Sequence, residues 1–466
     1  MRPGGDSKVA EGRRFALVSL GCAKNQVDSE GIQQLLIGDG YERVGSAAEA
    51  DLIVVNTCGF IDAAKQESID TLLQLGQAKR PGQRLLATGC LTERYADELA
   101  VEIGEIDALV GARNWASIPA LAERLSAMPA GTIRQPGSSL ELMEIAPPGA
   151  LDLAMPRRLA SGPSAYLKIS DGCNQKCAFC AIPSMKGLLR SKPVELVLRE
   201  TGELLEQGVR EIVLIAQDST NYGRDWGQRE GLARLLIAVT DAYPELPWIR
   251  VMYAYPSHVT ERFLRVMGDR PQICHYLDLP LQHTHPDTLR RMRRPHRPVD
   301  ELLAWIRGIV PDITIRTTFI TGFPGETQAE HEHLERSIER LGFGRVGVFL
   351  YSDEEGTPAF RHPNRIPRSV KQRRRHELME AARAASLRSN RTLVGAMLDV
   401  LIEGEGELAG RPVRIGRSRR DAPEVDGLVF VEGHASIGEI VPVRVTRALE
   451  YDLVAGPLSP RRESWG

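Results

Sequence analysis

Long apolar runs are absent from this sequence of 466 residues, because no stretch approaches the roughly 18 consecutive apolar residues needed to cross a bilayer. The N-terminal residues also lack the apolar segment of a secretory signal. We therefore expect a cytoplasmic protein without a membrane span. A charge excess is absent as well, since 59 Lys and Arg residues stand against 61 Asp and Glu residues. That balance argues against a dedicated nucleic-acid-binding protein, and we expect no stable nucleic-acid binding.

Cysteine is scarce, with seven residues in the chain. An odd number in a long chain without a secretory signal argues against a disulfide framework and favours metal binding or catalysis. Hydrophobic residues make up 42% and charged residues 26% of the chain. These ordinary globular values exclude a wholly disordered or fibrous protein. The length is typical of about three domains.

The first domain, expected at residues 13–128, alternates short β-branched runs with stretches of helical period. This pattern predicts a parallel α/β sheet with right-handed crossovers. The expected strands are 15–20, 52–56 and 85–88, and the expected helices are 28–37, 63–75 and 92–103. Residues 129–155 are rich in Pro, Gly and Ser, and we expect them to form a connector along the surface.

The second domain, expected at residues 156–392, contains six candidate strands separated by helical patterns. The strands are expected at 165–170, 212–216, 249–253, 276–281, 313–320 and 346–351, with helices at 193–206, 232–239, 259–267 and 299–309. Six βα units favour an open, partial (β/α)6 barrel, because the common closed form needs eight. The last stretch, 368–392, predicts a long basic helix, for which a solvated connector is the favoured interpretation.

Residues 393–460 contain short β-rich runs with Gly-rich turns, at 398–403, 428–432, 440–446 and 452–455. They predict a small β-barrel appended to the other two domains. The predicted fold class is therefore α/β, with an N-terminal parallel sheet, a central partial barrel and a C-terminal small β-barrel.

Three cysteines form the strongest motif, with Cys173, Cys177 and Cys180 in C-x3-C-x2-C spacing. They directly follow the first expected barrel strand, at the end of a barrel where active sites lie. Such a short loop can fold around one small cluster and direct three thiolates at it. A structural zinc site normally has four ligands, and no fourth Cys or His lies nearby in the sequence. Three thiolates on a 4Fe–4S cluster would instead leave one iron open for chemistry.

Three further cysteines each follow an expected strand of the first domain. They are Cys22, Cys58 and Cys90, spaced by 36 (22 to 58) and 32 (58 to 90) residues. Because parallel strands end at one edge of a sheet, we expect these cysteines to converge there. They predict a second cluster with three thiolates and one open iron; the alternative is three unrelated buried cysteines. The seventh cysteine, Cys274, is expected in the core.

Taken in order, these motifs resemble the methylthiotransferases of the radical S-adenosylmethionine superfamily. The resemblance spans residues 13–458, and its last part is similar to a TRAM domain. It rests on the three-cysteine loop and on the stretches 20–30, 56–61, 88–91, 182–187, 190–192, 216–219, 279–283, 316–327 and 351–358. The resemblance implies a transferase that inserts sulfur into a C–H bond, with two 4Fe–4S clusters and S-adenosylmethionine as cofactors.

The resemblance also implies a role for each set of cysteines. The cluster of Cys173, Cys177 and Cys180 would bind S-adenosylmethionine through its open iron and give a 5′-deoxyadenosyl radical, which removes a hydrogen from the substrate carbon. The cluster of Cys22, Cys58 and Cys90 would deliver a methylated sulfur to that carbon. Both clusters require a reducing compartment, and a reductase or flavodoxin-type protein is the expected electron donor.

Polar residues near the ends of the expected barrel strands are candidates for contacts with S-adenosylmethionine. For each of them, loop capping or hydrogen bonding inside the barrel is an equally good interpretation. The candidates are Gln217, Asp218, Ser257, Gln282 and Thr318, of which Thr318 lies within the fifth expected strand.

The two best-known branches of this family differ in substrate. One modifies an isopentenyl-adenosine in transfer RNA, and the other modifies the β-carbon of an aspartate in small-subunit ribosomal protein S-twelve. The stretch 21–30, which includes Lys24, and the stretch 216–223 resemble the ribosomal-protein branch. We therefore expect ribosomal protein S-twelve as the substrate, free or within the small subunit. Transfer RNA is the alternative, and a non-enzymatic iron–sulfur electron-transfer protein is less favoured.

The charge of the C-terminal part bears on the same choice. Residues 393–466 contain nine Arg, no Lys and twelve Asp and Glu, so their net charge is 9 − 12 = −3. An acidic surface suits a basic protein partner better than a phosphate backbone. An arginine cluster complicates this interpretation of the charge. It has two alternative interpretations: its members form a local basic stripe, or they pair with the nearby acids Asp421, Glu424 and Asp426. The cluster consists of Arg414, Arg417, Arg419 and Arg420.

Overall fold

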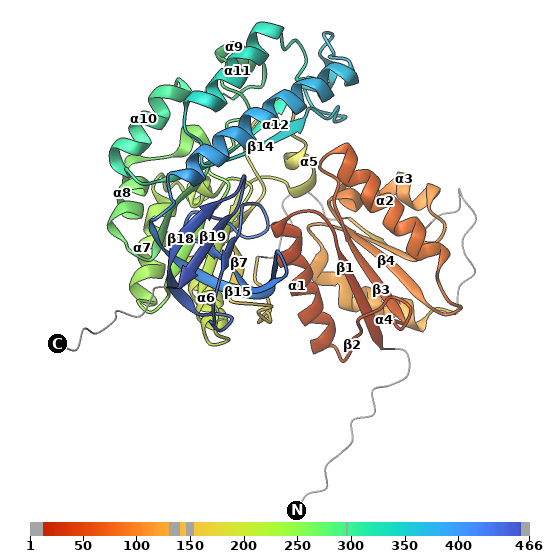
Figure 1. The fold of residues 1–466 in the computed structure, drawn as a ribbon. Helices are drawn as coiled ribbons and strands as arrows, with labels where there is room; N and C mark the ends of the chain where they lie inside the picture. Colours follow the sequence, from red (N-terminus) through yellow and green to blue (C-terminus); the bar gives the residue numbers. More distant parts are fainter. Residues whose placement is uncertain (1–12, 130–139, 146–152, 295–296, 458–466) are drawn as a thin grey trace, which may run out of the picture.

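The computed structural model describes residues 13–129, 140–145, 153–294 and 297–457. Figure 1 shows an N-terminal α/β sheet, a larger barrel of strands and helices, and a small β-barrel that lies against the larger one. Of the described helices, none combines the length and the apolar character that a bilayer crossing requires. The parts of the expected connector at 130–139 and 146–152, and the end of the expected C-terminal domain at 458–460, lie outside the described residues.

The N-terminal sheet has six parallel strands in the order β2-β1-β3-β4-β5-β6. The three expected strands are β1, β3 and β4, and every residue of β3 and β4 is buried. The others were not predicted because two to four residues are too short for a hydrophobic pattern. The strands are β1 Arg14–Ser19, β2 Glu42–Arg43, β3 Leu52–Thr57, β4 Arg84–Gly89, β5 Ala108–Gly111 and β6 Met143–Glu144.

Two expectations for this domain are corrected in detail. The expected surface connector contributes β6, which pairs with β5, so this part of it belongs to the sheet. The first helix begins five residues earlier than expected, directly after Cys22. The domain's α-helices are α1 Ala23–Gly38, α2 Asp62–Gln77, α3 Cys90–Glu102 and α4 Ile118–Ala127.

The central sheet consists of six parallel strands in the order β14-β13-β12-β11-β10-β7. Within the described part of the chain, the two edge strands β7 and β14 do not pair, so the partial barrel that the sequence predicts is confirmed. Its outer face packs against helices through one large apolar cluster. The strands are β7 Ser164–Lys168, β10 Glu211–Ile215, β11 Trp248–Val251, β12 Ile273–Asp278, β13 Thr314–Thr321 and β14 Arg345–Leu350.

The helices of the barrel follow its strands in alternation. The longer ones are α6 Val194–Leu205, α7 Gly231–Ala242, α8 Glu261–Asp269, α10 Val299–Ile309, α11 Gln328–Arg340 and α12 Arg368–Arg391. Shorter elements occupy the loops, among them β8 Ser170–Asp171, α5 Ile182–Lys186, β9 Arg190–Ser191, η2 Ser219–Asn221, η3 Arg224–Trp226, η4 Pro256–His258 and α9 Pro286–Arg291. These short elements lie at the carboxyl ends of the strands, the side that bears the three-cysteine loop.

The basic helix α12 is only partly solvated, so the connector interpretation is wrong for one of its faces. Leu378, Ala381, Ala382 and Ala385 are buried in the outer apolar cluster of the barrel. The helix packs on α11 and β14. Its small apolar residues recur at helical spacing, and the many arginines between them hid that pattern in the sequence.

The C-terminal residues form a closed barrel in the order β15-β16-β17-β19-β18, as the sequence predicts. The strands are β15 Met397–Leu408, β16 Arg411–Ser418, β17 Val429–Val431, β18 Ile440–Ala448 and β19 Leu453–Pro457. β16 was not predicted, because its sequence RPVRIGRS carries three arginines in eight residues. It nonetheless pairs with β15 along most of its length, so backbone pairing prevails over side-chain polarity here.

The small barrel is joined to the large one by buried charged side chains. Arg417 is 1% exposed and contacts Glu211 of β10 at 2.5 Å and Glu403 of β15 at 2.6 Å. Asp426 accepts a hydrogen bond from the Tyr276 hydroxyl at 2.6 Å. These contacts fix the small barrel against the starts and inner face of the central strands, on the side away from the cysteine loop.

Both interpretations of the arginine cluster are therefore corrected. Arg417 pairs with Glu211 and Glu403, and Arg414 pairs with Glu405 rather than with the acids at 421, 424 and 426. Arg419 donates to backbone carbonyls that precede β11 and β12. Two members of the cluster thus bind the small barrel to the central one, and they do not form a free basic stripe.

Candidate active site

The first trio of cysteines (Cys22, Cys58 and Cys90) lies at one edge of the N-terminal sheet, because β1, β3 and β4 are parallel and end level. In the hydrogen-bonding register, Asn56 of β3 pairs with Ser19, the last residue of β1, and Thr57 of β3 pairs with Gly89, the last residue of β4. Cys22 is the N-cap of α1, Cys58 lies just beyond β3, and Cys90 is the first residue of α3. The convergence expected from the sequence is present in the structure.

The thiols of this trio are held close together by their neighbours. Gly21 has φ +96°, and a Cβ atom placed there would lie 2.9 Å from the Cys58 Sγ. Asn25 donates to backbone carbonyls at the ends of β1 and β3, at 3.0 and 2.9 Å, and its Oδ1 lies 3.8 Å from the Cys90 Sγ. Asn25 was not singled out from the sequence, although its place in the first turn after Cys22 was a usable signal.

The second trio (Cys173, Cys177 and Cys180) lies in the loop between β8 and α5. The backbone turns the loop inward, with the Gln175 N–H directed at the Cys173 Sγ at 3.4 Å and the Cys180 N–H at the Cys177 carbonyl at 3.2 Å. Arg294 donates to the Cys177 Sγ at 3.6 Å. Arg294 was not predicted from the sequence, because it lies more than a hundred residues from Cys177 and only the folded chain brings the two side chains together.

Burial governs the acidity of these thiols. It raises the pKa of Cys90 and of Cys180 to about 12 and that of Cys173 to about 11, and neighbouring thiols of the same trio raise these pKa values further. Burial also raises the pKa of Cys58. Such thiols stay protonated at neutral pH unless a cation replaces the protons. Three soft sulfur donors converging in each trio fit the ligand set of an iron–sulfur cluster.

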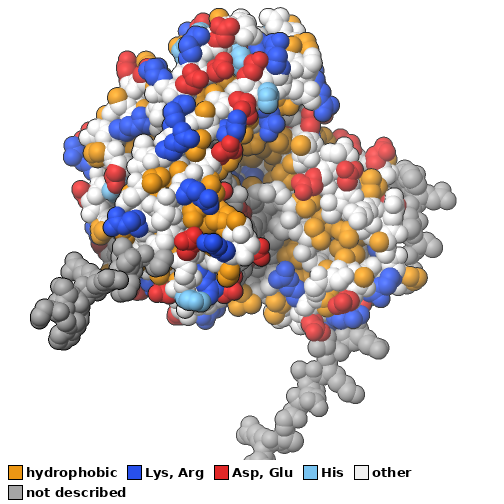
Figure 2. Space-filling model, viewed as in Figure 1, with side chains coloured by type: hydrophobic (Ala, Val, Ile, Leu, Met, Phe, Trp, Pro, Cys, Tyr) orange, Lys and Arg blue, Asp and Glu red, His pale blue; other side chains and the backbone are white. Residues whose placement is uncertain are grey.

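The two trios lie on facing parts of the molecule, with α5 between them. Ala181, Ile182 and Met185 pack against Cys90 in one small apolar cluster. Ala181 directly follows Cys180, so the chain that leaves the second trio packs against Cys90 of the first, whereas Cys22 is exposed. Figure 1 shows α5 beside α3, and Figure 2 shows that the surface is hollowed between the N-terminal domain and the barrel.

A buried ion cluster next to the trios connects the two domains. Lys186 of α5 lies 3.0 Å from Asp28 of α1, and Lys168 of β7 contacts both Asp28 and, at 3.0 Å, Asp171. Burial alone would raise the pKa of Asp171, but the ammonium groups of Lys168 and Lys186 lower it well below its ordinary value. The cluster therefore stays charged and fixes the cysteine loop to the first domain.

The predicted contacts with S-adenosylmethionine remain predictions, but the structure places each side chain. Gln217 Nε2 donates to Asp171 at 2.5 Å, which joins the end of β10 to the ion cluster. Asp218 is buried and accepts hydrogen bonds from Thr220 at 2.6 Å and from His258 at 2.8 Å. Its carboxylate thus stabilises the turn that follows β10.

The other three candidates lie on later strands. Ser257 belongs to η4, which follows β11. Gln282 has φ +71°, a strained backbone conformation typical of sites where a ligand approaches. Its backbone N–H donates to the Thr318 carbonyl, and its carbonyl accepts from the Ile320 N–H, so it pairs with β13 on both sides of Phe319. Thr318 alternates with the buried Phe319, so it lies on the inner face of the barrel as expected. Cys274 is fully buried on β12, as expected for a core residue.

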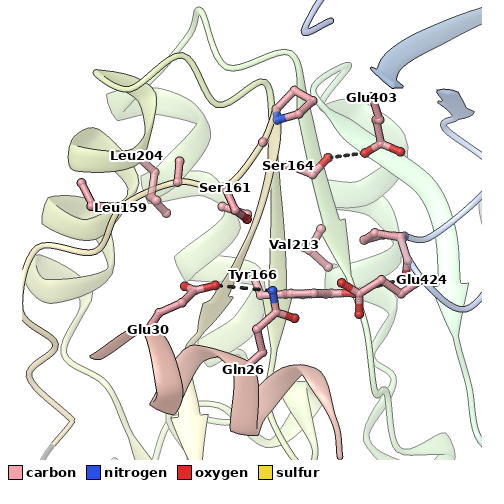
Figure 3. Close-up of a pocket in the computed structure, with 15 residues that line it drawn as sticks. Gln26, Glu30, Leu159, Ser161, Ser164, Tyr166, Leu204, Val213, Glu403 and Glu424 are labelled. Carbon is pink, nitrogen blue, oxygen red and sulfur yellow. Dashed lines mark hydrogen bonds between the residues drawn. The ribbon is translucent and has the colours of Figure 1, made fainter. Parts of the chain in front are cut away.

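A cavity lies elsewhere, away from the six cysteines. It measures about 250 Å³, and Figure 3 shows it between α1, the start of β7 and the small barrel. Gln26 and Glu30 line it from α1, and Glu403 and Glu424 line it from the C-terminal part. None of the six cysteines lines this cavity. It is therefore separate from the trios.

Comparison with protein families matches three segments of the chain. Residues 14–111 match the family described as "Uncharacterized protein family UPF0004", residues 167–338 match the radical SAM superfamily, and residues 394–457 match the TRAM domain. The first match contains the Cys22, Cys58 and Cys90 trio, and the second contains the cysteine loop.

Curated relatives match almost the whole chain. A protein of Roseiflexus sp. (strain RS-1), named ribosomal protein uS12 methylthiotransferase RimO, is 48% identical over 457 residues, which cover 94% of this chain and 96% of the relative. A protein of the same name from Chloroflexus aurantiacus is 49% identical and is covered in full, with 96% of this chain.

Among solved structures, the fold resembles the radical S-adenosylmethionine methyltransferase TsrM from Kitasatospora setae. The structure with tryptophan and a SAM analogue bound has a TM-score of 0.55 and 14% identity, and the match covers 83% of this chain and 78% of that chain. The structure with cobalamin and a [4Fe-4S] cluster bound has a TM-score of 0.52. At this level of identity the likeness concerns the fold alone.

Proposed function

This chain belongs to the radical S-adenosylmethionine methylthiotransferase family, and from that premise we propose that it inserts a methylthio group at the β-carbon of an aspartate in small-subunit ribosomal protein S-twelve. The relatives that match nearly its full length carry the name of that activity. The observation that supports the chemistry most directly is the pair of cysteine trios separated by α5.

Each trio supplies a ligand set for one 4Fe–4S cluster. Cys173, Cys177 and Cys180 would hold the cluster that binds S-adenosylmethionine, and the trio of the N-terminal domain would hold the second. When bound, these groups supply a carbon-centred radical able to remove a hydrogen from an unactivated carbon, and a sulfur for insertion. Two clusters on opposite sides of one hollow are what this division of labour requires.

The protein's own residues position these ligands and keep water away from them. The apolar contact of Ala181, Ile182 and Met185 with Cys90 covers this member of the first trio. Arg294 donates to the Cys177 Sγ and so orients this side chain. The Lys168, Lys186, Asp28 and Asp171 cluster holds the two cysteine-bearing domains in one orientation. We propose a cytoplasmic, reducing location and a reductase or flavodoxin-type electron donor, because all six thiols must stay reduced.

The substrate assignment is tested by deleting the gene and weighing the ribosomal proteins and the digested transfer RNA. Loss of one methylthio group from ribosomal protein S-twelve, with unchanged transfer RNA, is the expected result. Loss of a methylthio group from an adenosine of transfer RNA, with unchanged ribosomal protein, would overturn the assignment while leaving the chemistry intact. Re-expression of the intact chain serves as the control, since it should restore the modification.

A further inference from the structure

Lys24 is a positive charge of the N-terminal domain that reaches the barrel. It is the second residue of α1 and follows Cys22 of the first trio by two positions. Its Nζ lies 3.3 Å from the centroid of the Tyr253 ring. Tyr253 lies two residues beyond the end of β11, at the carboxyl ends of the barrel strands, and has φ +62°. The contact therefore bridges the first trio and the rim of the barrel.

The same contact leads on to the second trio. Tyr255 lies two residues beyond Tyr253, and the Arg294 guanidinium stacks on its ring at 4.2 Å. Arg294 also donates to the Cys177 Sγ at 3.6 Å. The Lys24 ammonium thus lies between α1, which begins directly after Cys22 of the first trio, and the segment 253–255, which contacts Arg294 next to Cys177 of the second trio. A substrate that reacts with both trios must come to this part of the molecule.

No carboxylate among the described residues lies within ion-pair distance of the Lys24 ammonium, although the more distant Asp278 carboxylate acts on its charge, and this distinguishes Lys24 from the lysines around it. Lys168, Lys186 and Lys192 are buried, and each lies within ion-pair distance of at least one carboxylate. Lys24 is partly exposed, and its ammonium lies over the Tyr253 ring and interacts with the Tyr253 side chain. An ammonium has three donors, so a cation held against an aromatic face retains donors for an incoming anion.

We propose that Lys24 binds the side-chain carboxylate of the substrate aspartate and so holds the reacting carbon between the two trios. This inference rests on the proposed function. In aspartate, the carboxylate carbon is bonded directly to the β-carbon, so an ammonium that fixes the carboxylate also fixes the carbon that reacts. Lys24 is then a residue that determines specificity, because a neutral base in a nucleic acid offers it no anion.

The test uses the full chain with reconstituted clusters and three variants. Lys24→Met removes the charge, and Lys24→Arg keeps it. Lys79→Met is the control and removes a lysine that lies two residues beyond the end of α2 and pairs with Asp107. The substrates are ribosomal protein S-twelve with its target aspartate and the same protein with asparagine at that position. The methylthio product is measured by mass spectrometry as a function of substrate and of S-adenosylmethionine concentration.

We expect Lys24→Met to lower kcat/KM for the aspartate substrate about 100-fold more than for the asparagine substrate, since an unpaired charge is left only in the first case. Lys24→Arg should restore part of the preference, and Lys79→Met should keep it. An equal loss on both substrates would overturn the inference, because it would indicate a structural role. So would a change confined to the KM for S-adenosylmethionine, which would identify that carboxylate as the ligand. Failure of the unaltered enzyme to modify S-twelve would instead refute the proposed function.

Discussion

The Lys186 ammonium lies 3.0 Å from the Asp28 carboxylate, and this buried pair joins the helix that follows the second cysteine trio to the helix that follows Cys22. Both side chains are at most 5% exposed. Asp28 also contacts Lys168, so a single carboxylate of the first domain receives two cations of the second. Asp28, Lys168 and Lys186, which belong to neither trio, therefore hold the two trio-bearing domains together.

Asp28→Asn should destabilise the protein strongly, because it leaves two buried ammonium groups with one carboxylate fewer. We expect a loss of about 3 kcal/mol in the free energy of unfolding. Urea denaturation of the full chain measures it. Asp39→Asn, at an exposed position after the same helix, is the control and should change stability little. A loss below about 1 kcal/mol for Asp28→Asn would contradict a structural role for the ion cluster.

Gly21→Ala should displace Cys58, because the added Cβ would lie 2.8 Å from the Cys58 Cβ and 2.9 Å from its Sγ. We expect the reconstituted protein to lose about half of its iron, the share of one of two four-iron clusters. Gly82→Ala is the matched control, since Gly82 has a similar φ of +85° but open space around it. If both variants bind the same amount of iron, crowding at Cys58 does not matter for the first trio.

Single replacements in the two trios should separate their functions. Cys177→Ala should abolish 5′-deoxyadenosine formation, because its cluster is the one assigned to S-adenosylmethionine. Cys58→Ala should abolish methylthio transfer while cleavage of S-adenosylmethionine continues at a reduced rate. Liquid chromatography of the nucleoside and mass spectrometry of the substrate protein measure the two reactions. Retained deoxyadenosine formation in Cys177→Ala would remove the role assigned to the cysteine loop.

Glu211 should make stability depend on pH in the acid range. Burial works in the opposite direction, but the guanidinium groups of Arg250 and Arg417 lower the pKa of this carboxyl to about 2. A carboxyl with a lowered pKa in the folded state stabilises fully above its unfolded value, about 4.5, and loses that contribution as the pH falls toward 2. The contribution is about 3 kcal/mol at neutral pH.

The comparison of Glu211→Gln with the unaltered chain isolates this contribution. The difference in unfolding free energy, measured on protein without clusters under reducing conditions, should be large at pH 7 and should shrink between pH 4.5 and pH 3. Glu123→Gln, at an exposed position of α4, should show a small difference throughout. A Glu211→Gln difference that is the same at both ends of the range would refute the assignment.

Much of the architecture was predictable because the signals are local. Apolar runs alternate with helical stretches, and this pattern located every strand of the central barrel to within a few residues. The failures were local as well. β16 carries three arginines in eight residues, and this polarity masked its pairing as a strand. Basic residues interrupt the apolar face of α12, and they masked the burial of that face.

The cysteine trios show where sequence information ends. Spacing and strand order were enough to predict that Cys22, Cys58 and Cys90 converge, because parallel strands end at the same edge of a sheet. Nothing in the local sequence indicated that Arg294 would contact Cys177, or that Arg417 would pair with Glu211. Such partners are more than a hundred residues apart, and only the packing of the domains brings them together.

By itself, the sequence determined the three parts of the protein, the two sets of three cysteines and the family to which the chain belongs, because hydrophobic period and cysteine spacing are properties of short segments. The tertiary structure decided how the trios are placed relative to each other and which charges are buried next to them. It also decided that the Lys24 ammonium lies over the Tyr253 ring, with no described carboxylate within ion-pair distance. These features depend on contacts between distant segments, whose free energy is realised only when the domains pack.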